Sequence, residues 1–129
     1  MKKILRSIRF ALRGLRHAYL SDKSFRMEIN YGLPIYVILG WFLFPFAAWE
    51  LALYVFSYAL ILVVELINTA FEKMIDRVHP QEHESIGRSK DMSAAAVLLT
   101  FLFAAFIVGI LVYVRIYGSI PWTVSRTFV

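Results

Sequence analysis

Three long apolar blocks without a single charged side chain dominate the pattern of the chain, at residues 29–49, 51–64 and 92–114. A helix rises 1.5 Å per residue, so about 20 apolar residues cross a bilayer core of roughly 30 Å. The first and third blocks are long enough alone, and the second reaches this length if the helix continues to about residue 71. The pattern therefore predicts three transmembrane helices, over 29–49, 51–71 and 92–114.

The segment 1–28 has a different pattern. Basic residues recur every three or four positions and apolar residues fill another face: Lys2, Arg6, Arg9, Arg13 and Arg16 against Ile4, Leu5, Ile8, Leu12 and Leu15. This arrangement is typical of an amphipathic helix that lies on an anionic membrane surface. Taken alone, it is equally compatible with anchoring of the topology and with phosphate binding.

The distribution of charge predicts the orientation in the membrane. Eight Lys and Arg residues precede the first block and four lie between the second and third, so twelve of the fourteen share one side. Basic residues stay in the cytoplasm, which places the N-terminus inside and the C-terminus outside. Eight of the nine acids lie on the cytoplasmic side too, with Glu50 as the exception. A polar loop over 77–89, broken by Pro80, is expected between the last two spans.

Composition supports a membrane protein of one domain, residues 1–129. Apolar residues make up 60% of the chain, above the soluble norm of roughly half, and the mean hydropathy is +0.65. The absence of cysteine excludes disulfides, thiolate metal sites and a cysteine nucleophile. The basic residues border segments that must enter lipid, so no nucleic-acid partner is expected. The expected fold class is an all-α integral membrane protein.

One polar stripe stands out at the end of the second span. Glu65, Asn68, Glu72 and Asp76 are spaced three, four and four residues apart, which places them on one face of a helix. A structural alternative is a polar seam that joins helices, as amides often do. Three acids on one stripe repel each other, however, unless a cation or a proton lies among them. Acids at membrane depth usually mark function.

The residue types of this stripe favour phosphoryl transfer. Mg²⁺ takes one or two carboxylates together with substrate phosphates, and Glu72 with Asp22 or Glu28 could supply them. Lys90 could neutralise phosphate charge. Glu65 is the deepest acid, and its removal from water disfavours the charged form, as suits a general base near neutral pH. The sequence therefore predicts transfer of a phosphoryl group from a soluble nucleotide to a hydroxyl carried by a lipid.

Two alternatives of other classes compete with an enzyme. A cation channel or proton-relay subunit would need acids through the full depth of the bilayer, whereas here they cluster at one interface. A non-catalytic assembly subunit could use Asn68 for packing, but it gives the acids no purpose. No G-x-x-x-x-G-K-[ST] or H-E-x-x-H motif points to a soluble enzyme. Of the three histidines, His83 in the polar loop is the best candidate for a ligand contact.

The motifs also resemble a known family. The chain contains the run Glu65-Leu-Ile-Asn68-Thr69-Ala-Phe-Glu72-x-x-x-Asp76, followed by His83-Glu84, Gly87-Arg88 and Lys90-Asp91-Met-Ser-Ala-Ala-Ala. This pattern resembles the small prokaryotic diacylglycerol kinases, which include the undecaprenol kinases. The region 76–97 is closer to the Gram-negative diacylglycerol kinase branch. The resemblance implies a homotrimer in the bacterial inner membrane that phosphorylates diacylglycerol to phosphatidic acid with ATP and Mg²⁺, with active sites shared between neighbouring subunits. Undecaprenol as acceptor stays open.

The resemblance also implies roles for individual residues. Glu65 matches the catalytic base, Asn68 a residue that orients the site, and Asp22 and Glu72 the metal-binding carboxylates. Asp22 is an aspartate where the family usually has glutamate. The expected ATP contacts are Lys3, Phe10, Asp22, Glu72, Gln81, Glu82, His83, Lys90 and Asp91, although the family has arginine at position 3 and tyrosine at position 10. The expected lipid contacts are Arg16, Arg26, Glu28, Glu65, Ser93 and Ala94.

Overall fold

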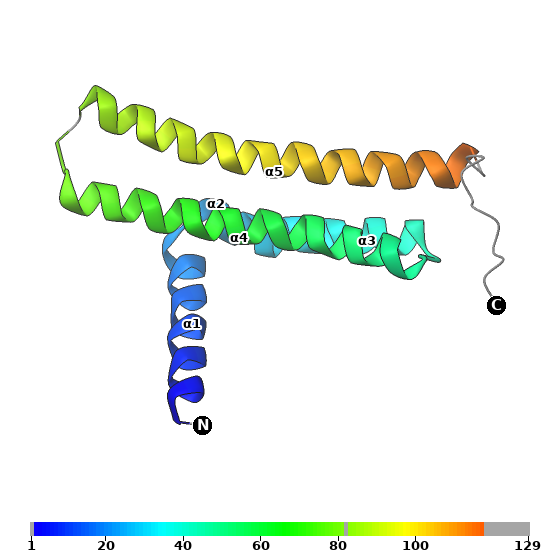
Figure 1. The fold of residues 1–129 in the computed structure, drawn as a ribbon, viewed down its shortest axis with the longest axis horizontal. Coiled ribbons are helices and arrows are strands. Elements are labelled where there is room, and N and C mark those ends of the chain that lie inside the picture. Colours follow the sequence, from blue (N-terminus) through cyan, green and yellow to red (C-terminus); the bar gives the residue numbers. More distant parts are fainter. Residues whose placement is uncertain (1, 82, 118–129) are drawn as a thin grey trace.

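The computed structural model describes residues 2–81 and 83–117, and every element in this part is a helix. The expected ATP contact Glu82 and the tail 118–129 lie outside the described residues. In chain order, the elements are α1 (Lys2–Ser21), α2 (Lys23–Met27), a π-helical turn η1 (Glu28–Gly32), α3 (Leu33–Leu43), α4 (Ala48–Val78) and α5 (Glu84–Tyr117). Helices α3, α4 and α5 run alongside one another in alternating directions, while α1 leaves them crosswise (Figure 1). This crosswise course agrees with the expected surface helix.

Helix α1 ends earlier than the predicted boundary at residue 28. Asp22 leaves the helical conformation, and its carboxylate Oδ1 accepts a hydrogen bond of 2.8 Å from the backbone N–H of Phe25. A short acidic side chain at this position is a favourable N-cap, so it starts a new helix at Lys23. The chain thereby changes direction between the surface helix and the first apolar block.

Two helices of the described chain are long and apolar enough to cross a membrane, α4 with 31 residues and α5 with 34. They contain the predicted spans 51–71 and 92–114. At 1.5 Å per residue they are about 46 and 51 Å long, well beyond a hydrocarbon core of roughly 30 Å. The expected loop over 77–89 was therefore too long, because α4 continues to Val78 and α5 already begins at Glu84. The parts of α4 and α5 that exceed the thickness of the hydrocarbon core include Glu72, Asp76 and Lys90.

The first predicted span, 29–49, has different bounds in the structure. Helical backbone runs from Lys23 through η1 to Leu43, and residues 44–47 form the connection to α4. Phe44 is extended, with ψ of 143°, because a residue that precedes proline is disfavoured in the helical region. Pro45 therefore ends the helix six residues before the predicted boundary.

Three tyrosines hold α3 against α4. The ring of Tyr36 lies 4.2 Å from that of Tyr54 and 4.7 Å from that of Tyr58, measured between centroids. The Tyr36 hydroxyl lies 2.5 Å from Oγ of the fully buried Ser57. Tyr54 donates to the carbonyl of Tyr36, and Tyr58 to that of Glu28. Each hydroxyl is paired, as an apolar environment requires.

Most apolar side chains of the single chain have no cover. Only eight apolar residues of the described part are buried, and exposed ones extend along α3, α4 and α5, for instance Trp41 at 82% and Leu99 at 64% exposure. A soluble monomer does not expose a continuous apolar surface of this extent. Lipid or neighbouring chains must cover it.

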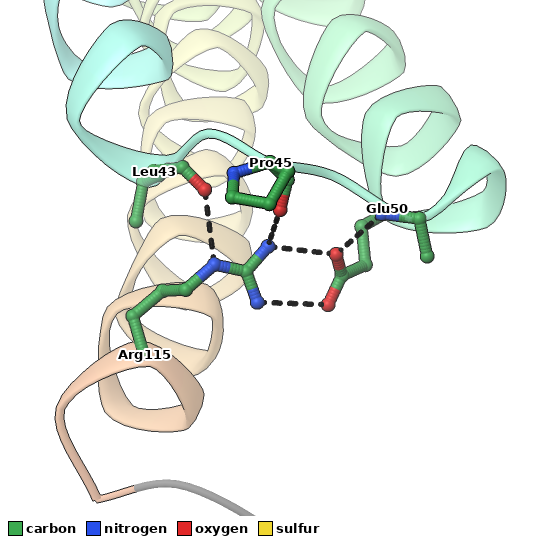
Figure 2. Close-up of polar contacts among 5 residues, drawn as sticks. Leu43, Pro45, Glu50 and Arg115 are labelled. Carbon is green, nitrogen blue, oxygen red and sulfur yellow. Dashed lines mark hydrogen bonds and ion pairs between the residues drawn. The ribbon is translucent and has the colours of Figure 1, made fainter.

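A charged cluster connects α3, α4 and α5 at the end of the bundle that lies opposite the connection between α4 and α5 (Figure 2). Arg115 of α5 donates to the carbonyls of Leu43 and Pro45, at 2.9 and 2.6 Å, and forms an ion pair of 2.8 Å with Glu50. Glu50 is 6% exposed and also accepts from the N–H of Ala47 at 2.8 Å. We call these contacts the Arg115 clamp. The charge pattern did not predict it, because counting charges does not pair residues 65 positions apart.

Candidate active site

Glu65 is buried in α4, at 4% exposure, so its side chain is covered by other parts of the chain. The carboxylates of Asp22, Glu28 and Glu72 lie near enough to repel its charge. Asp22 and Glu28 come from the segment between α1 and α3, and Glu72 lies two turns further along α4. The fold therefore places three further predicted site carboxylates, from separate parts of the chain, within electrostatic range of Glu65. Such a group favours a cation or a proton among its members.

Asn68 links α4 to α5 beside these acids. Its amide nitrogen lies 3.2 Å from Oε1 of Glu72, and its amide oxygen lies 2.5 Å from Oγ of Ser93. The orienting role expected for Asn68 thus has a geometric basis. Of the two expected lipid contacts on α5, Ser93 bonds to Asn68 and Ala94 is exposed.

The carboxylates fit a metal ion that is completed by substrate. Among residues 2–81 and 83–117, no three acidic or histidine side chains converge to form a protein cage. Mg²⁺ does not need one, because it is commonly held by one or two carboxylates and by phosphate oxygens. The N-cap bond engages one of the two carboxylate oxygens of Asp22, which leaves Oδ2 as a possible ligand. Asp22 therefore combines a helix cap with a candidate metal contact, and an aspartate suits the first role better than glutamate.

Glu28 is positioned by the π-helical turn. Its backbone carbonyl accepts a hydrogen bond of 2.6 Å from the Tyr58 hydroxyl. Its carboxylate lies over Gly32, where an added Cβ would be 2.7 Å from Oε2 and 3.0 Å from the Tyr58 oxygen. Only glycine leaves room for this approach. The expected lipid contact Arg26 lies nearby in α2 and reaches the carbonyl of Leu20 at 3.4 Å.

The resemblance implies that Glu28 contacts a lipid substrate, so we expect Gly32→Ala to raise the KM for that lipid several-fold with little change in thermal stability. The added methyl group meets the ends of the Glu28 and Tyr58 side chains rather than backbone atoms, and the flexible Glu28 carboxylate, at 2.7 Å, is the group that must move. Kinetics over a lipid concentration series and melting curves in detergent would measure both quantities. Gly109→Ala is the matched control, since no atom lies within 4 Å of its added Cβ. Equal kinetics for the two variants would show that Gly32 does not position Glu28 for substrate.

A polar pocket of about 530 Å³ lies where α4 meets α5. It includes three of the expected nucleotide contacts, Gln81, His83 and Lys90. Lys90 forms an ion pair of 2.5 Å with Asp76, and Nδ1 of His83 lies 2.7 Å from Oγ of Ser85. Asp91, also expected to contact ATP, is exposed on α5. The pocket can accommodate a polar, charged ligand, with Asp76, Glu84 and Lys90 as its charged lining residues.

An apolar groove of about 490 Å³ lies between α1 and α4. Its lining includes Leu15 and Ala18 of α1 and Leu66 and Thr69 of α4. The Thr69 hydroxyl oxygen is buried and has no hydrogen-bond partner among the described residues. Lys73, at the same groove, donates to the hydroxyl of Ser21. The sequence pattern assigned no role to Thr69 and Lys73, although both lie in the segment 65–76 that contains the acidic stripe. An apolar chain that ends in a polar group suits this groove.

The single chain does not bring all expected site residues together. Lys3, Phe10 and Arg16 are exposed on α1, and the N-terminal end of α1 lies far from the connection between α4 and α5 (Figure 1). The Phe10 ring instead contacts the guanidinium groups of Arg6 and Arg13, at 5.7 and 5.5 Å. Within one chain, the expected ATP contacts on the N-terminal half of α1, Lys3 and Phe10, therefore lie away from Gln81 and His83.

Comparison with known proteins agrees with the residue pattern. Residues 9–113 match the family model described as prokaryotic diacylglycerol kinase. The chain is 34% identical over 102 residues to a diacylglycerol kinase of Escherichia coli K12, covering 79% of this chain and 82% of that protein. It is 29% identical over 109 residues to a diacylglycerol kinase of Haemophilus influenzae, covering 82% and 88% of the two chains. A Synechocystis diacylglycerol kinase is 33% identical over 107 residues, which are 82% of this chain and 59% of that protein. The chain belongs to the prokaryotic diacylglycerol kinase family.

Proposed function

We propose that the protein transfers the γ-phosphoryl group of ATP to the hydroxyl of a membrane lipid, converting diacylglycerol to phosphatidic acid. One observation carries the proposal. The buried acid Glu65 lies within electrostatic range of three further carboxylates. The same chain has an apolar groove at α1 and a polar pocket at the connection of α4 and α5. The relatives named diacylglycerol kinase support the same reaction.

In the proposed reaction, the oxygen of the lipid hydroxyl attacks the γ-phosphorus of ATP, and the Glu65 carboxylate takes the proton of that hydroxyl. The bond from that phosphorus to the bridging oxygen breaks, and ADP leaves with the electron pair. A base held close to the attacking hydroxyl accelerates such a step by about 10²- to 10⁴-fold. Glu65 lies one helical turn before Thr69, which lines the apolar groove where an alcohol carried by a lipid would arrive.

The other polar residues hold and orient the nucleotide. Glu72 and Asp22 would hold Mg²⁺, and the ion would supply positive charge against the phosphate groups of the nucleotide. Lys90 adds positive charge at the polar pocket, where it lies beside Asp76. Asn68 holds the Glu72 carboxylate through its amide.

Assembly as a homotrimer with three membrane spans per chain completes the proposal. The helical backbone from Lys23 to Leu43 measures about 32 Å at 1.5 Å per residue, which matches a bilayer core. Neighbouring subunits would cover the exposed apolar faces and bring the α1 residues Lys3 and Phe10 to an adjacent nucleotide pocket. The expected location is the bacterial inner membrane, with the N-terminus and the active site at the cytoplasmic face.

A direct test uses purified protein in mixed micelles with γ-labelled ATP and Mg²⁺. Diacylglycerol and undecaprenol are offered separately and together. We expect label in phosphatidic acid, with a higher kcat/KM for diacylglycerol. Preferential labelling of undecaprenol would make the polyprenol the acceptor. If neither lipid is labelled and the reconstituted protein conducts ions without consuming ATP, the kinase proposal is wrong.

A further inference from the structure

The Ser93 hydroxyl lies between two hydrogen-bond acceptors, although it carries only one hydrogen. Its Oγ lies 2.5 Å from Oδ1 of Asn68 and 3.1 Å from the backbone carbonyl of Lys90. A hydroxyl donates one hydrogen bond and accepts up to two. Ser93 can therefore donate to Asn68 or to Lys90, but not to both at the same time.

Two hydrogen-bond patterns satisfy this geometry. In the first, Ser93 donates to Oδ1 of Asn68, and Asn68 donates through its NH₂ group to Glu72, 3.2 Å away. In the second, the Asn68 amide is reversed. Its NH₂ group donates to Ser93, Ser93 donates to the Lys90 carbonyl, and the amide oxygen faces Glu72. The two ends of an asparagine amide are nearly equal in shape, so both patterns fit the same space.

The two patterns differ in what they offer at Glu72. A free carboxylate accepts a hydrogen bond from NH₂, so the first pattern suits a metal-free Glu72. A divalent cation on the carboxylate repels the NH₂ group and binds an amide oxygen, so the second pattern suits a metal-bound Glu72. Reversal of the Asn68 amide costs little free energy only if the end of the amide that faces away from Glu72 has a hydrogen-bond partner in both orientations. A hydroxyl can both donate and accept, and therefore pairs with either end.

We propose that Ser93 is a positioning residue that allows the Asn68 amide to reverse, presenting NH₂ to free Glu72 and its oxygen to a divalent cation held there. The inference rests on the proposed function, because that function places a cation at Glu72. It assigns the Ser93 hydroxyl to metal binding instead of to the lipid contact expected from the sequence.

The test measures Mn²⁺ binding by electron paramagnetic resonance, with the full chain in micelles and a non-hydrolysable ATP analogue. We expect Ser93→Ala to weaken Mn²⁺ binding by roughly three- to tenfold, as the loss of one hydrogen bond predicts. Ser93→Thr retains the hydroxyl and should bind Mn²⁺ like the wild type. Ser89→Ala is the matched control, because the Ser89 hydroxyl lies one turn earlier on α5 and, within residues 2–81 and 83–117, donates to the Ser85 carbonyl alone.

The outcomes separate this inference from the proposed function. Equal Mn²⁺ affinity of Ser93→Ala and wild type would overturn the inference, even if lipid phosphorylation is observed. Equal weakening in Ser93→Ala and Ser89→Ala would also overturn it, because helix stability would then explain both. Absence of lipid phosphorylation by a wild type that binds Mn²⁺ would refute the proposed reaction alone. A wild type that binds no Mn²⁺ would overturn the inference and the proposed metal site together.

Discussion

Replacing Glu65 by glutamine is expected to lower the rate of lipid phosphorylation by about 100-fold or more. Glutamine has nearly the same volume and fits the same buried position, but its amide cannot accept the proton of the lipid hydroxyl. The decrease should appear in kcat at saturating ATP and lipid, measured as transfer of label from ATP to the lipid fraction.

The same variant should fold and assemble normally. Removing the charge relieves repulsion from Asp22, Glu28 and Glu72, so the melting temperature in detergent should equal or exceed that of the wild type. Size-exclusion chromatography would check that the oligomer is intact. Retention of more than about a tenth of the activity by Glu65→Gln would contradict the role of this residue as a base.

Replacing Arg115 by methionine is expected to destabilise the protein by about 3–5 kcal/mol, the typical effect of leaving a buried charge without its partner. Glu50 would keep its carboxylate in a buried position, and the carbonyls of Leu43 and Pro45 would lose their donor. The free energy of unfolding, measured by titration with a denaturing detergent, tests this expectation.

Arg88→Met is a matched control for this experiment. Arg88 also pairs with a glutamate, Glu84, but both side chains are more than 70% exposed. Its replacement should cost no more than about 0.5 kcal/mol. A double variant with Arg115→Met and Glu50→Gln should regain part of the lost stability, because the unpaired charge is removed. Equal costs for the two arginine variants would show that the clamp contributes no more than a surface ion pair.

The sequence was sufficient for the features that depend on local pattern. Apolar blocks at 51–71 and 92–114 predicted the central parts of α4 and α5, since a segment of that length and hydropathy has few alternatives. The spacing from Glu65 to Asp76 predicted one polar face because helix geometry fixes it. Asp22 and Glu28 were identified as candidate partners of this face, and the structure brings both close to Glu65.

Features that depend on contacts between distant segments could not be predicted in this way. The pairing of Arg115 with Glu50 and the tyrosine contacts between α3 and α4 require knowledge of which helices touch. The overlong prediction for the loop has another cause. The segments around Asp76 and Lys90 are polar, and polarity alone does not separate a solvated helix from a loop. The start of a new helix after Asp22, in contrast, could have been predicted, because aspartate is a favoured N-cap residue.

The Arg115 clamp has a consequence for how the helices respond to membrane thickness. It fastens the beginning of α4 to the end of α5 through charges that are costly to draw into hydrocarbon, so in the proposed membrane arrangement this end would stay at one surface of the bilayer. A mismatch between helix length and membrane thickness is then taken up at the other end, where Glu65 and Glu72 lie. The immersion depth of the proposed base is thereby tied to the acyl-chain length of the surrounding phospholipids.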